Sequence, residues 1–209
     1  MTPKDELRAA YLQRRRDISD EERQSAAKAA GVLFASFSLF KRSSYCAYLS
    51  NENEMPTCHL IRQIFAWNAS LAIPAWDAPT KSYHLCAFHG QTKVITGHYG
   101  IREPEHHVPV TPSSIRLFLI PGVAFDTNGN RIGHGKGYYD AILTSAAPNA
   151  LKVGLCYDWQ ITPSPIPAEP HDIPVDFLLT DRRILCCNPS KLHAKTSSCA
   201  GNTLFHPGL

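Results

Sequence analysis

The sequence predicts a single α/β domain in which a mostly parallel sheet is flanked by helices. Apolar runs typical of buried strands alternate with helical patterns, and this order is the one that produces parallel sheets. The 209-residue chain is also long enough to bury one core without disulfides. No window of the sequence is long and apolar enough to span a bilayer. We expect the folded domain to occupy residues 1–189.

The expected elements follow in order along the chain. Thr2 and Asp5 form a capping-box pattern that begins a first helix, and Ser19 and Glu22 repeat this pattern for a second helix reaching about Phe37. Strands are expected at 44–49, 70–76, 83–88, 115–120, 150–156 and 175–180, and further helices at 57–67 and 138–146. The strand at 83–88 is expected to be antiparallel or peripheral, and the strand at 175–180 to be the last.

Two segments are expected to lie outside this regular framework. The proline-rich run at 161–174 cannot join a strand ladder and predicts a loop. Residues 190–209 are polar and unpatterned, so we expect a disordered C-terminal tail.

Composition narrows the class of protein. Seven cysteines without a C-x-x-C pair favour buried thiols in a reducing compartment over disulfides or a zinc site. None of the ten histidines has ligand spacing, so none is assigned to a metal. The N-terminus lacks the apolar segment of a secretory signal, which favours the cytoplasm. A net charge of +3 suits an anionic small molecule, and the Arg14–Arg16 run is interpreted as a surface cluster, not a nucleic-acid site.

The stretch "GNRIGHGKGYYD" (129–140) follows the strand at 115–120 and carries the clearest functional signal. In an open parallel sheet, ligands bind beyond the carboxyl ends of the strands. The alternating glycines Gly133, Gly135 and Gly137 allow backbone N–H groups to surround an anion, and Arg131 and Lys136 add positive charge. The stretch matches neither a Walker A loop nor the dinucleotide fingerprint. A phosphate site is favoured over the alternative, a long turn that only reverses the chain.

Two aspartates suggest a cation near that phosphate. Asp140 begins the helix that follows the glycines, where it serves either the helix dipole or a Mg²⁺ ion held together with phosphate oxygens. Asp176 lies in the last expected strand among apolar residues, and a carboxylate there needs a partner or a metal. The two aspartates and the glycine loop together predict a magnesium–nucleotide site.

The segment "PGVAFDTNGNRIGHGKGYYD" (121–140) resembles the signature of the 5-formyltetrahydrofolate cyclo-ligase family, also called methenyltetrahydrofolate synthetases. The resemblance continues in Lys4-x-x-x-Arg8, in Arg16, in "YLSNENEMPT" (48–57), and in "AIP", "IREP" and "HDIPVDFLLT", covering about residues 3–182. It implies a fold akin to the NagB/RpiA/CoA-transferase group. It also implies a cytoplasmic, monomeric enzyme that uses ATP and Mg²⁺ to convert 5-formyltetrahydrofolate into 5,10-methenyltetrahydrofolate, ADP and phosphate.

The resemblance also implies residue roles. ATP would be bound by Lys4, Arg8, Arg131, Ile132, Gly133, His134, Gly135, Lys136, Gly137, Tyr138 and Tyr139. Catalysis would rest on Arg131, Lys136, Tyr138 and Tyr139, substrate binding on Asn53, Glu54 and Tyr138, and Mg²⁺ binding on Asp140 and Asp176. Either Tyr138 or Tyr139 would face the formyl group. Lys93 and Arg102 are candidates for contacts with the glutamate tail of the folate.

Two other functions are compatible with these residues. One is a different ATP-dependent enzyme on the same scaffold, acting on another amide or formamide. The other is a non-catalytic nucleotide-binding module that kept the loop. Both metal-site aspartates, Glu54 and the N-terminal basic pair occur together, which counts against the module.

Overall fold

A central sheet organises the molecule. The computed structural model describes residues 2–51, 53–192 and 203–205. Within them, nine strands form one sheet in the order β13-β12-β11-β10-β7-β1-β2-β3-β6. Its middle consists of parallel strands: β11 (Phe177–Leu179), β10 (Leu151–Leu155), β7 (Leu117–Ile120), β1 (Ser44–Cys46) and β2 (Ser70–Asp77). The predicted fold class, a single α/β domain with a mostly parallel sheet, is confirmed.

Antiparallel strands complete both edges of the sheet. On one edge lie β3 (Ser82–Phe88), antiparallel as expected, and the two-residue β6 (Pro109–Val110). On the other edge lie β12 (Ile184–Cys186) and β13 (Thr203–Phe205). The prediction that the strand at 175–180 is the last one is therefore wrong, because the chain turns back twice after it.

The expected disorder of residues 190–209 falls mostly on residues outside those described. Within the described part, Pro189–Lys191 form a 3₁₀ turn and Thr203–Phe205 pair with β12. The boundary at residue 189 and the disordered tail stay predictions.

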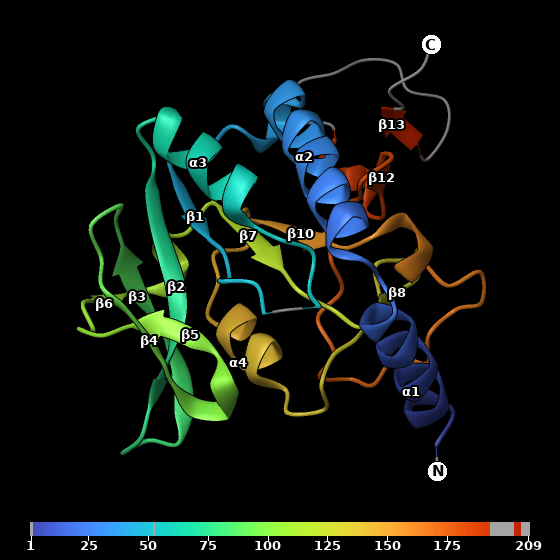
Figure 1. Ribbon diagram of the computed structural model, residues 1–209, viewed down its shortest axis with the longest axis horizontal. Coiled ribbons are helices and arrows are strands. Elements are labelled where there is room, and N and C mark those ends of the chain that lie inside the picture. The colour runs from blue at the N-terminus through green and yellow to red at the C-terminus, as the bar shows by residue number, and fades with distance from the viewer. Residues whose placement is uncertain (1, 52, 193–202, 206–209) are drawn as a thin grey trace.

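Helices cover the two faces of the sheet (Figure 1). The amphipathic helices α2 (Asp20–Ser36) and α3 (Cys58–Ala66) bury Leu33, Phe34, Leu60 and Ile64 against one face. On the opposite face, α4 (Tyr138–Thr144) buries Ile142 and Leu143. Apolar side chains on both faces of the parallel strands explain why their sequences are continuously hydrophobic.

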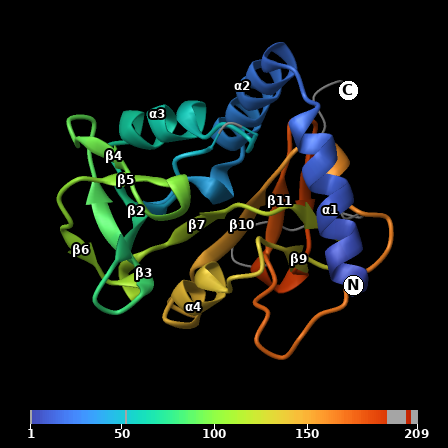
Figure 2. The same cartoon turned by 60° about the horizontal axis from the view of Figure 1, so that its bottom comes forward.

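Helix α1 (Pro3–Arg16) packs away from the sheet, beside a small hairpin of β8 (Ala124–Phe125) and β9 (Arg131–Ile132) (Figure 2). The Thr2–Asp5 capping box predicted from the sequence is present. Leu7, Tyr11 and Leu12 pack on a cluster formed by Val123, Ala124, Ile132 and Ile166. This contact fixes the N-terminal helix beside the loop that follows β7.

The remaining elements are short. A separate hairpin of β4 (Val94–Thr96) and β5 (Arg102–Pro104) lies near β2 and β3. Further 3₁₀ turns are Ser38–Phe40, His98–Gly100, Pro112–Ser114 and Asp158–Gln160. The proline-rich run 161–174 is a loop, as predicted, touching the ladder only through a single Phe125–Ile161 bridge. Among the described residues, no helix combines the length and hydrophobicity that crossing a membrane requires, and the six described cysteines are free thiols.

Candidate active site

A cavity of about 670 Å³ lies beyond the carboxyl ends of the parallel strands. Segments far apart in the sequence line it: the start of α1, the ends of β1 and β7, the glycine loop with the start of α4, the β4–β5 hairpin and the proline-rich loop. Its charged side chains are Lys4, Asp5, Arg8, Glu54, Arg102, Arg131, Lys136, Asp140, Glu169 and Asp172. Its aromatic side chains include Tyr48, Tyr83, Tyr99, Tyr138 and Tyr139. The position agrees with the expectation for an open parallel sheet.

The glycine loop forms one wall of the cavity. Gly135 and Gly137 have φ values of 84° and 66°, a left-handed conformation that other residues adopt only with strain. Gly133 has no such constraint, and a Cβ atom there would meet no neighbour within 4 Å. All three glycines, together with Ile132 and His134, line the cavity as predicted. The loop therefore brings its backbone to the cavity surface without intervening side chains at alternate positions.

Helix α1 brings two cations to this loop. The Arg8 Nε donates to the Gly133 carbonyl at 2.9 Å, which holds the loop against the helix. The Lys4 ammonium lies 3.0 Å from Glu169 and 2.9 Å from Asp172. Burial alone would lower the pKa of Lys4, but these two carboxylates outweigh burial and raise it, so Lys4 stays charged. Lys4 and Arg8, to which the family resemblance gave a role, thus both line the cavity.

Arg131 and Asp140 form a largely buried ion pair at the same wall. The Arg131 guanidinium lies 2.7 Å from Asp140 Oδ1, with side-chain exposures of 8% and 19%. The backbone N–H of Ile173 donates to the same oxygen at 3.2 Å. This second bond brings the glycine-loop aspartate next to the proline-rich loop. Asp140 therefore lies beside the glycine loop at the cavity, as the sequence predicted.

Asp176 does not reach the cavity, so the predicted pairing of Asp140 with Asp176 is wrong. Its carboxylate accepts hydrogen bonds from the backbone N–H of Lys152 at 2.9 Å and from the Asn188 amide at 3.0 Å. The Lys152 ammonium lies 3.5 Å away. Asp176 precedes β11, and the residue before a parallel strand lies at the amino edge of the sheet, opposite the cavity. These contacts compensate the buried charge of Asp176, so this carboxylate needs no metal ion.

Asp172 is the carboxylate that sequence reasoning missed. It lies four residues before Asp176 in the same "HDIPVD" segment and lines the cavity. The pKa of its carboxyl group is lowered, because hydrogen bonds from the Glu169 backbone N–H and from Lys4 outweigh the raising effect of burial. Its neighbour Ile173 bonds to Asp140, so the two carboxylates come from adjacent segments. The residues before 175 show no strand pattern in the sequence. This would have placed Asp172 in a loop, unlike Asp176 in the strand.

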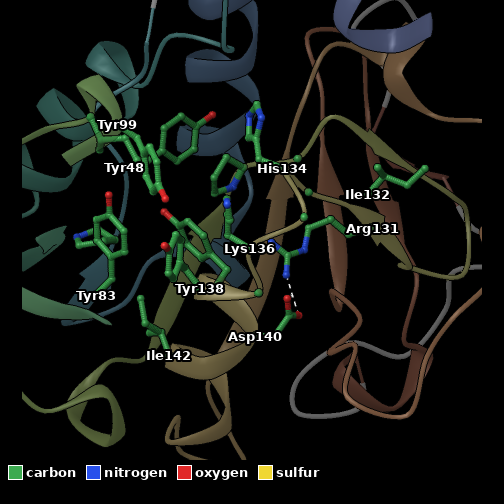
Figure 3. Close-up of a pocket in the computed structure, with 18 of the residues that line it drawn as sticks. Tyr48, Tyr83, Tyr99, Arg131, Ile132, His134, Lys136, Tyr138, Asp140 and Ile142 are labelled. Atoms are coloured by element: carbon green, nitrogen blue, oxygen red, sulfur yellow. Dashed lines mark hydrogen bonds and ion pairs between the residues drawn. The ribbon is translucent and has the colours of Figure 1, made fainter. Parts of the chain in front are cut away.

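Aromatic side chains gather on the opposite side of the cavity (Figure 3). The Tyr83 and Tyr138 rings have centroids 4.8 Å apart, and Trp76 packs edge-on against both. The Lys136 ammonium lies 5.5 Å from the centre of the Tyr99 ring, within range of a cation–π contact. Within the described residues, Lys136 has no carboxylate partner at ion-pair distance. This lysine stands between the aromatic side and the glycine loop.

Tyr138 and Tyr139 occupy different surroundings. Tyr138 belongs to the aromatic group, whereas the Arg131 guanidinium lies 5.8 Å from the Tyr139 ring. Within the described residues the buried hydroxyl of Tyr139 has no hydrogen-bond partner. Burial raises the pKa of Tyr139 well above its usual value, so the hydroxyl stays protonated and able to donate. Tyr139 lines the cavity, and a buried hydroxyl without a partner is a candidate donor for a bound ligand if the side chain turns toward it.

Glu54 lies at the cavity on the loop after β1, held by its surroundings. Its Oε2 accepts from the Asn51 backbone N–H at 3.0 Å, and Arg15 lies 4.0 Å from its Oε1. Arg15 is only 5% exposed and donates from Nε to the Asn53 carbonyl at 2.9 Å. The interpretation of Arg14–Arg16 as a surface cluster is therefore wrong for Arg15. Asn53 does not line the cavity and contributes its carbonyl to this arrangement.

The two residues considered for the folate tail are separated by the fold. Arg102 lines the cavity, and its guanidinium donates to the Ser50 carbonyl at 3.0 Å. Lys93 does not line the cavity; its ammonium pairs with Glu105 at 2.9 Å and its side chain is 75% exposed. Arg102 is thus the cation of this pair that a cavity ligand would meet.

Comparisons with known proteins agree with these motifs. The model of the 5-formyltetrahydrofolate cyclo-ligase family matches residues 1–181. A 5-formyltetrahydrofolate cyclo-ligase of Mycolicibacterium smegmatis is 29% identical, over 86% of this chain and 94% of the relative. One from Saccharomyces cerevisiae is 30% identical, over 78% of this chain and 86% of the relative.

A solved structure shows the same architecture. The NMR structure of the Aquifex aeolicus 5,10-methenyltetrahydrofolate synthetase superposes with a TM-score of 0.78 at 29% identity, covering 96% of this chain and 97% of that one. The family resemblance predicted from the motifs is confirmed. With the family model spanning nearly all of the described domain and the fold matching throughout, the chain belongs to the 5-formyltetrahydrofolate cyclo-ligase family.

Proposed function

We propose that the protein converts 5-formyltetrahydrofolate into 5,10-methenyltetrahydrofolate in a reaction that consumes ATP and requires Mg²⁺. One observation carries the proposal beyond family membership. A single cavity joins a glycine loop surrounded by cations to a group of aromatic side chains, and the carboxylate of Glu54 lines the same cavity. The cationic side suits the phosphates of ATP, and the aromatic side suits a flat pterin.

The chemistry explains why no protein nucleophile is needed. The carbon of an N-formyl group is unreactive, because amide resonance donates electron density to it and its oxygen is a poor leaving group. Transfer of the γ-phosphoryl group from ATP to the formyl oxygen forms an O–P bond and releases ADP. The folate nitrogen N10 then attacks the formyl carbon and loses its proton to solvent, and the C–O bond breaks to release phosphate. The protein's task is to position the two substrates and to compensate negative charge.

Four cations support the assignment of the glycine loop to ATP. Lys4, Arg8, Arg131 and Lys136 all line the cavity beside backbone N–H groups of the loop. Lys136 has no carboxylate partner among the described residues, so its charge is available to the phosphoryl group in transit. Arg131 is held by Asp140 and stays in place as charge moves.

The residues present also fit a magnesium ion, held by Asp140 and Asp172. Mg²⁺ prefers oxygen ligands and is commonly bound by one or two carboxylates together with phosphate oxygens and water. Ile173 links the two carboxylates, and among the described residues no donor lies within 3.5 Å of one oxygen of each, although the His171 ring is 3.8 Å from Asp172 Oδ1. When bound, the ion would neutralise the phosphates and orient them. Asp172 replaces Asp176 in this assignment.

Three residues support the assignment of the other side to the folate. Glu54 accepts hydrogen bonds from neighbouring N–H groups of a pterin, a geometry that carboxylates meet well. The unpaired Tyr139 hydroxyl is the donor we assign to the formyl oxygen, in preference to Tyr138. Arg102 is assigned to the carboxylates of the glutamate tail.

The test is a spectrophotometric assay with the purified full chain. We expect (6S)-5-formyltetrahydrofolate to give the near-ultraviolet absorbance of the methenyl product only when ATP and Mg²⁺ are both present. A flat trace from folded protein that still binds ATP would contradict the folate assignment and favour another formamide. ATP binding without turnover of any formamide would favour a nucleotide-binding module. We further propose that the protein acts in the cytoplasm as a monomer, as the family resemblance implies; its described thiols are free.

A further inference from the structure

A second group of chemically reactive side chains lies outside the cavity, at the edge of the sheet. His84 and Cys86 are two residues apart on β3, so both point to the same face. His107 lies just before β6, in a segment joined to β3 by the Ala87 N–H to Val108 carbonyl bond of 2.8 Å. Among the described residues, these three form a group whose nitrogen and sulfur atoms all lie within 4.8 Å of one another. None of them lines the cavity.

We propose that His84, Cys86 and His107 form a binding site for a divalent transition metal ion, with Zn²⁺ as the expected occupant. Two imidazole nitrogens and one thiolate are borderline to soft ligands, which suit zinc and exclude Mg²⁺ and Ca²⁺. Three protein ligands leave a fourth tetrahedral position for water or for a nearby carboxylate. This proposal does not depend on the proposed function, because the site is separate from the cavity.

Asp77 supplies the compensating charge. It lies on β2 opposite Ser82, on the same face as His84 across the β2–β3 pair. Hydrogen bonds from Thr80 are the main cause that lowers the pKa of Asp77, and the charges of His84 and His107 lower it further. The negative charge of Asp77 therefore lies near both rings, although its carboxylate is not one of the three groups whose ligand atoms lie within 4.8 Å of one another. Metal-binding histidines commonly have such a carboxylate neighbour.

The distances require a small adjustment of side chains. Bonds of about 2.0–2.1 Å to nitrogen and 2.3 Å to sulfur put tetrahedral ligand atoms roughly 3.3–3.6 Å apart. The present separations reach up to 4.8 Å, with the two imidazole rings 5.0 Å apart and edge-to-face. His107 is exposed and His84 is partly exposed, so both rings are free to rotate toward Cys86. The buried sulfur anchors the group.

Binding must release a proton from Cys86. Burial, together with the nearby charge of Glu103, raises the pKa of Cys86 to about 11, so the metal-free thiol is protonated at neutral pH. Burial and His107 lower the pKa of His84, so this ring needs no deprotonation. The charged or titratable groups facing the site are thus Asp77, His84, Glu103 and His107.

The expected effect of the ion is structural. β6 has only two residues and forms the edge of the sheet, so few backbone bonds hold it. An ion shared by β3 and the segment before β6 would join this edge to its neighbour. The sequence did not reveal the group, because His107 is separated from Cys86 by twenty residues and comes close only through strand pairing.

The test is a titration of the full chain, expressed without a polyhistidine tag, with Co²⁺ as the probe. We expect one equivalent to bind, with intense visible bands of tetrahedral cobalt and a near-ultraviolet sulfur-to-cobalt charge-transfer band, and Zn²⁺ to displace it. His107→Ala should weaken binding by at least about 100-fold, because loss of even an outer partner costs 10- to 100-fold. Cys86→Ser should abolish the charge-transfer band.

Two matched variants serve as controls. His106→Ala removes the adjacent histidine, whose side chain is 90% exposed, and Cys58→Ser removes an exposed thiol outside the group. Both should leave cobalt binding unchanged. Absence of a charge-transfer band in the unmodified chain overturns the proposal, as does a band that survives in Cys86→Ser or disappears in Cys58→Ser. Because His107 is exposed, His107→Ala should fold normally, which far-ultraviolet circular dichroism checks.

Discussion

Arg131 and Asp140 form an ion pair of 2.7 Å between the two ends of the glycine loop. The pair closes the loop on itself, and the Ile173 N–H joins it to the proline-rich loop. The Asp140 carboxylate therefore pairs with Arg131 and accepts a hydrogen bond from the proline-rich loop. In the proposed function it also binds a magnesium ion.

We expect Asp140→Asn to lower kcat by at least about 100-fold, because it removes the charge that holds both Arg131 and the proposed ion. The measurement is the rate of methenyl product formation over a range of Mg²⁺ concentrations. Unfolding by urea should show a folded protein of lower stability, since Arg131 loses its partner. Full turnover by Asp140→Asn would contradict the assignment of Asp140 to the metal site.

We expect Asp176→Asn to show the opposite pattern. The amide would place a donor against the donors of Lys152 or Asn188 and leave a partly buried lysine without its ion-pair partner, lowering the free energy of unfolding by about 3 kcal/mol. Turnover per folded molecule and the Mg²⁺ requirement should stay unchanged. Urea unfolding and the product assay measure the two effects separately. If Asp176→Asn required more Mg²⁺ for turnover, the result would support Asp176 as a metal ligand and contradict this prediction.

The two tyrosines should differ in their effects on chemistry. Tyr139→Phe removes a buried hydroxyl that lacks a protein partner, and we expect kcat to fall about 10- to 100-fold with little change in the KM for ATP. Tyr138→Phe keeps its aromatic contacts with Tyr83 and Trp76, so its kcat should change less than threefold. Steady-state kinetics of both variants make the comparison. A larger loss in Tyr138→Phe would reverse the assignment.

Glu54→Gln should weaken binding of the folate selectively. Replacing a charged acceptor by an amide is expected to raise the KM for 5-formyltetrahydrofolate about 10- to 100-fold, with the KM for ATP nearly unchanged. Glu105→Gln is the matched control, because Glu105 pairs with Lys93 and does not line the cavity. Equal effects on both KM values would mean that Glu54 supports the cavity in general and does not select the folate.

The ion pair of Lys4 with Asp172 predicts an acid-dependent loss of stability. The pKa of Asp172 is lower in the folded than in the unfolded chain, so its stabilising contribution is present above the unfolded pKa of about 3.9 and is lost as pH falls through the folded value. Urea unfolding between pH 2.5 and 6 should therefore show a decline below about pH 4. Asp172→Asn should flatten part of this decline, whereas Glu21→Gln, at an exposed position, should not.

The parallel core was predictable because burial on both faces leaves continuous apolar runs such as Leu117–Ile120. Strands of two or three residues, such as β6 and β8, have too few positions to show a sequence pattern. They form only because neighbouring strands pair with them. The polar start of α1 was predictable from its capping box. The edge strands β12 and β13 were not, since they depend on a chain reversal after β11.

The candidate site was predictable where a local motif carries it. The glycine loop was found from its own pattern, whereas Lys4, Arg8 and Glu54 were found only through the family resemblance, and the structure brings them to one cavity. Asp172 and Arg15 were missed, because their roles follow from which loop meets which helix and not from neighbouring residues. Asp176 was chosen wrongly, since a buried aspartate in sequence gives no sign of the sheet edge on which it lies.

Lys4 and Asp172 meet although 168 residues separate them along the chain. On the ribosome, the first helix therefore emerges long before the loop that binds it. The cavity cannot assemble until residue 172 has left the exit tunnel, when most of the chain has already been synthesised. A chain truncated before that loop would retain the glycine motif but lack the part of the cavity wall that Glu169, His171 and Asp172 form.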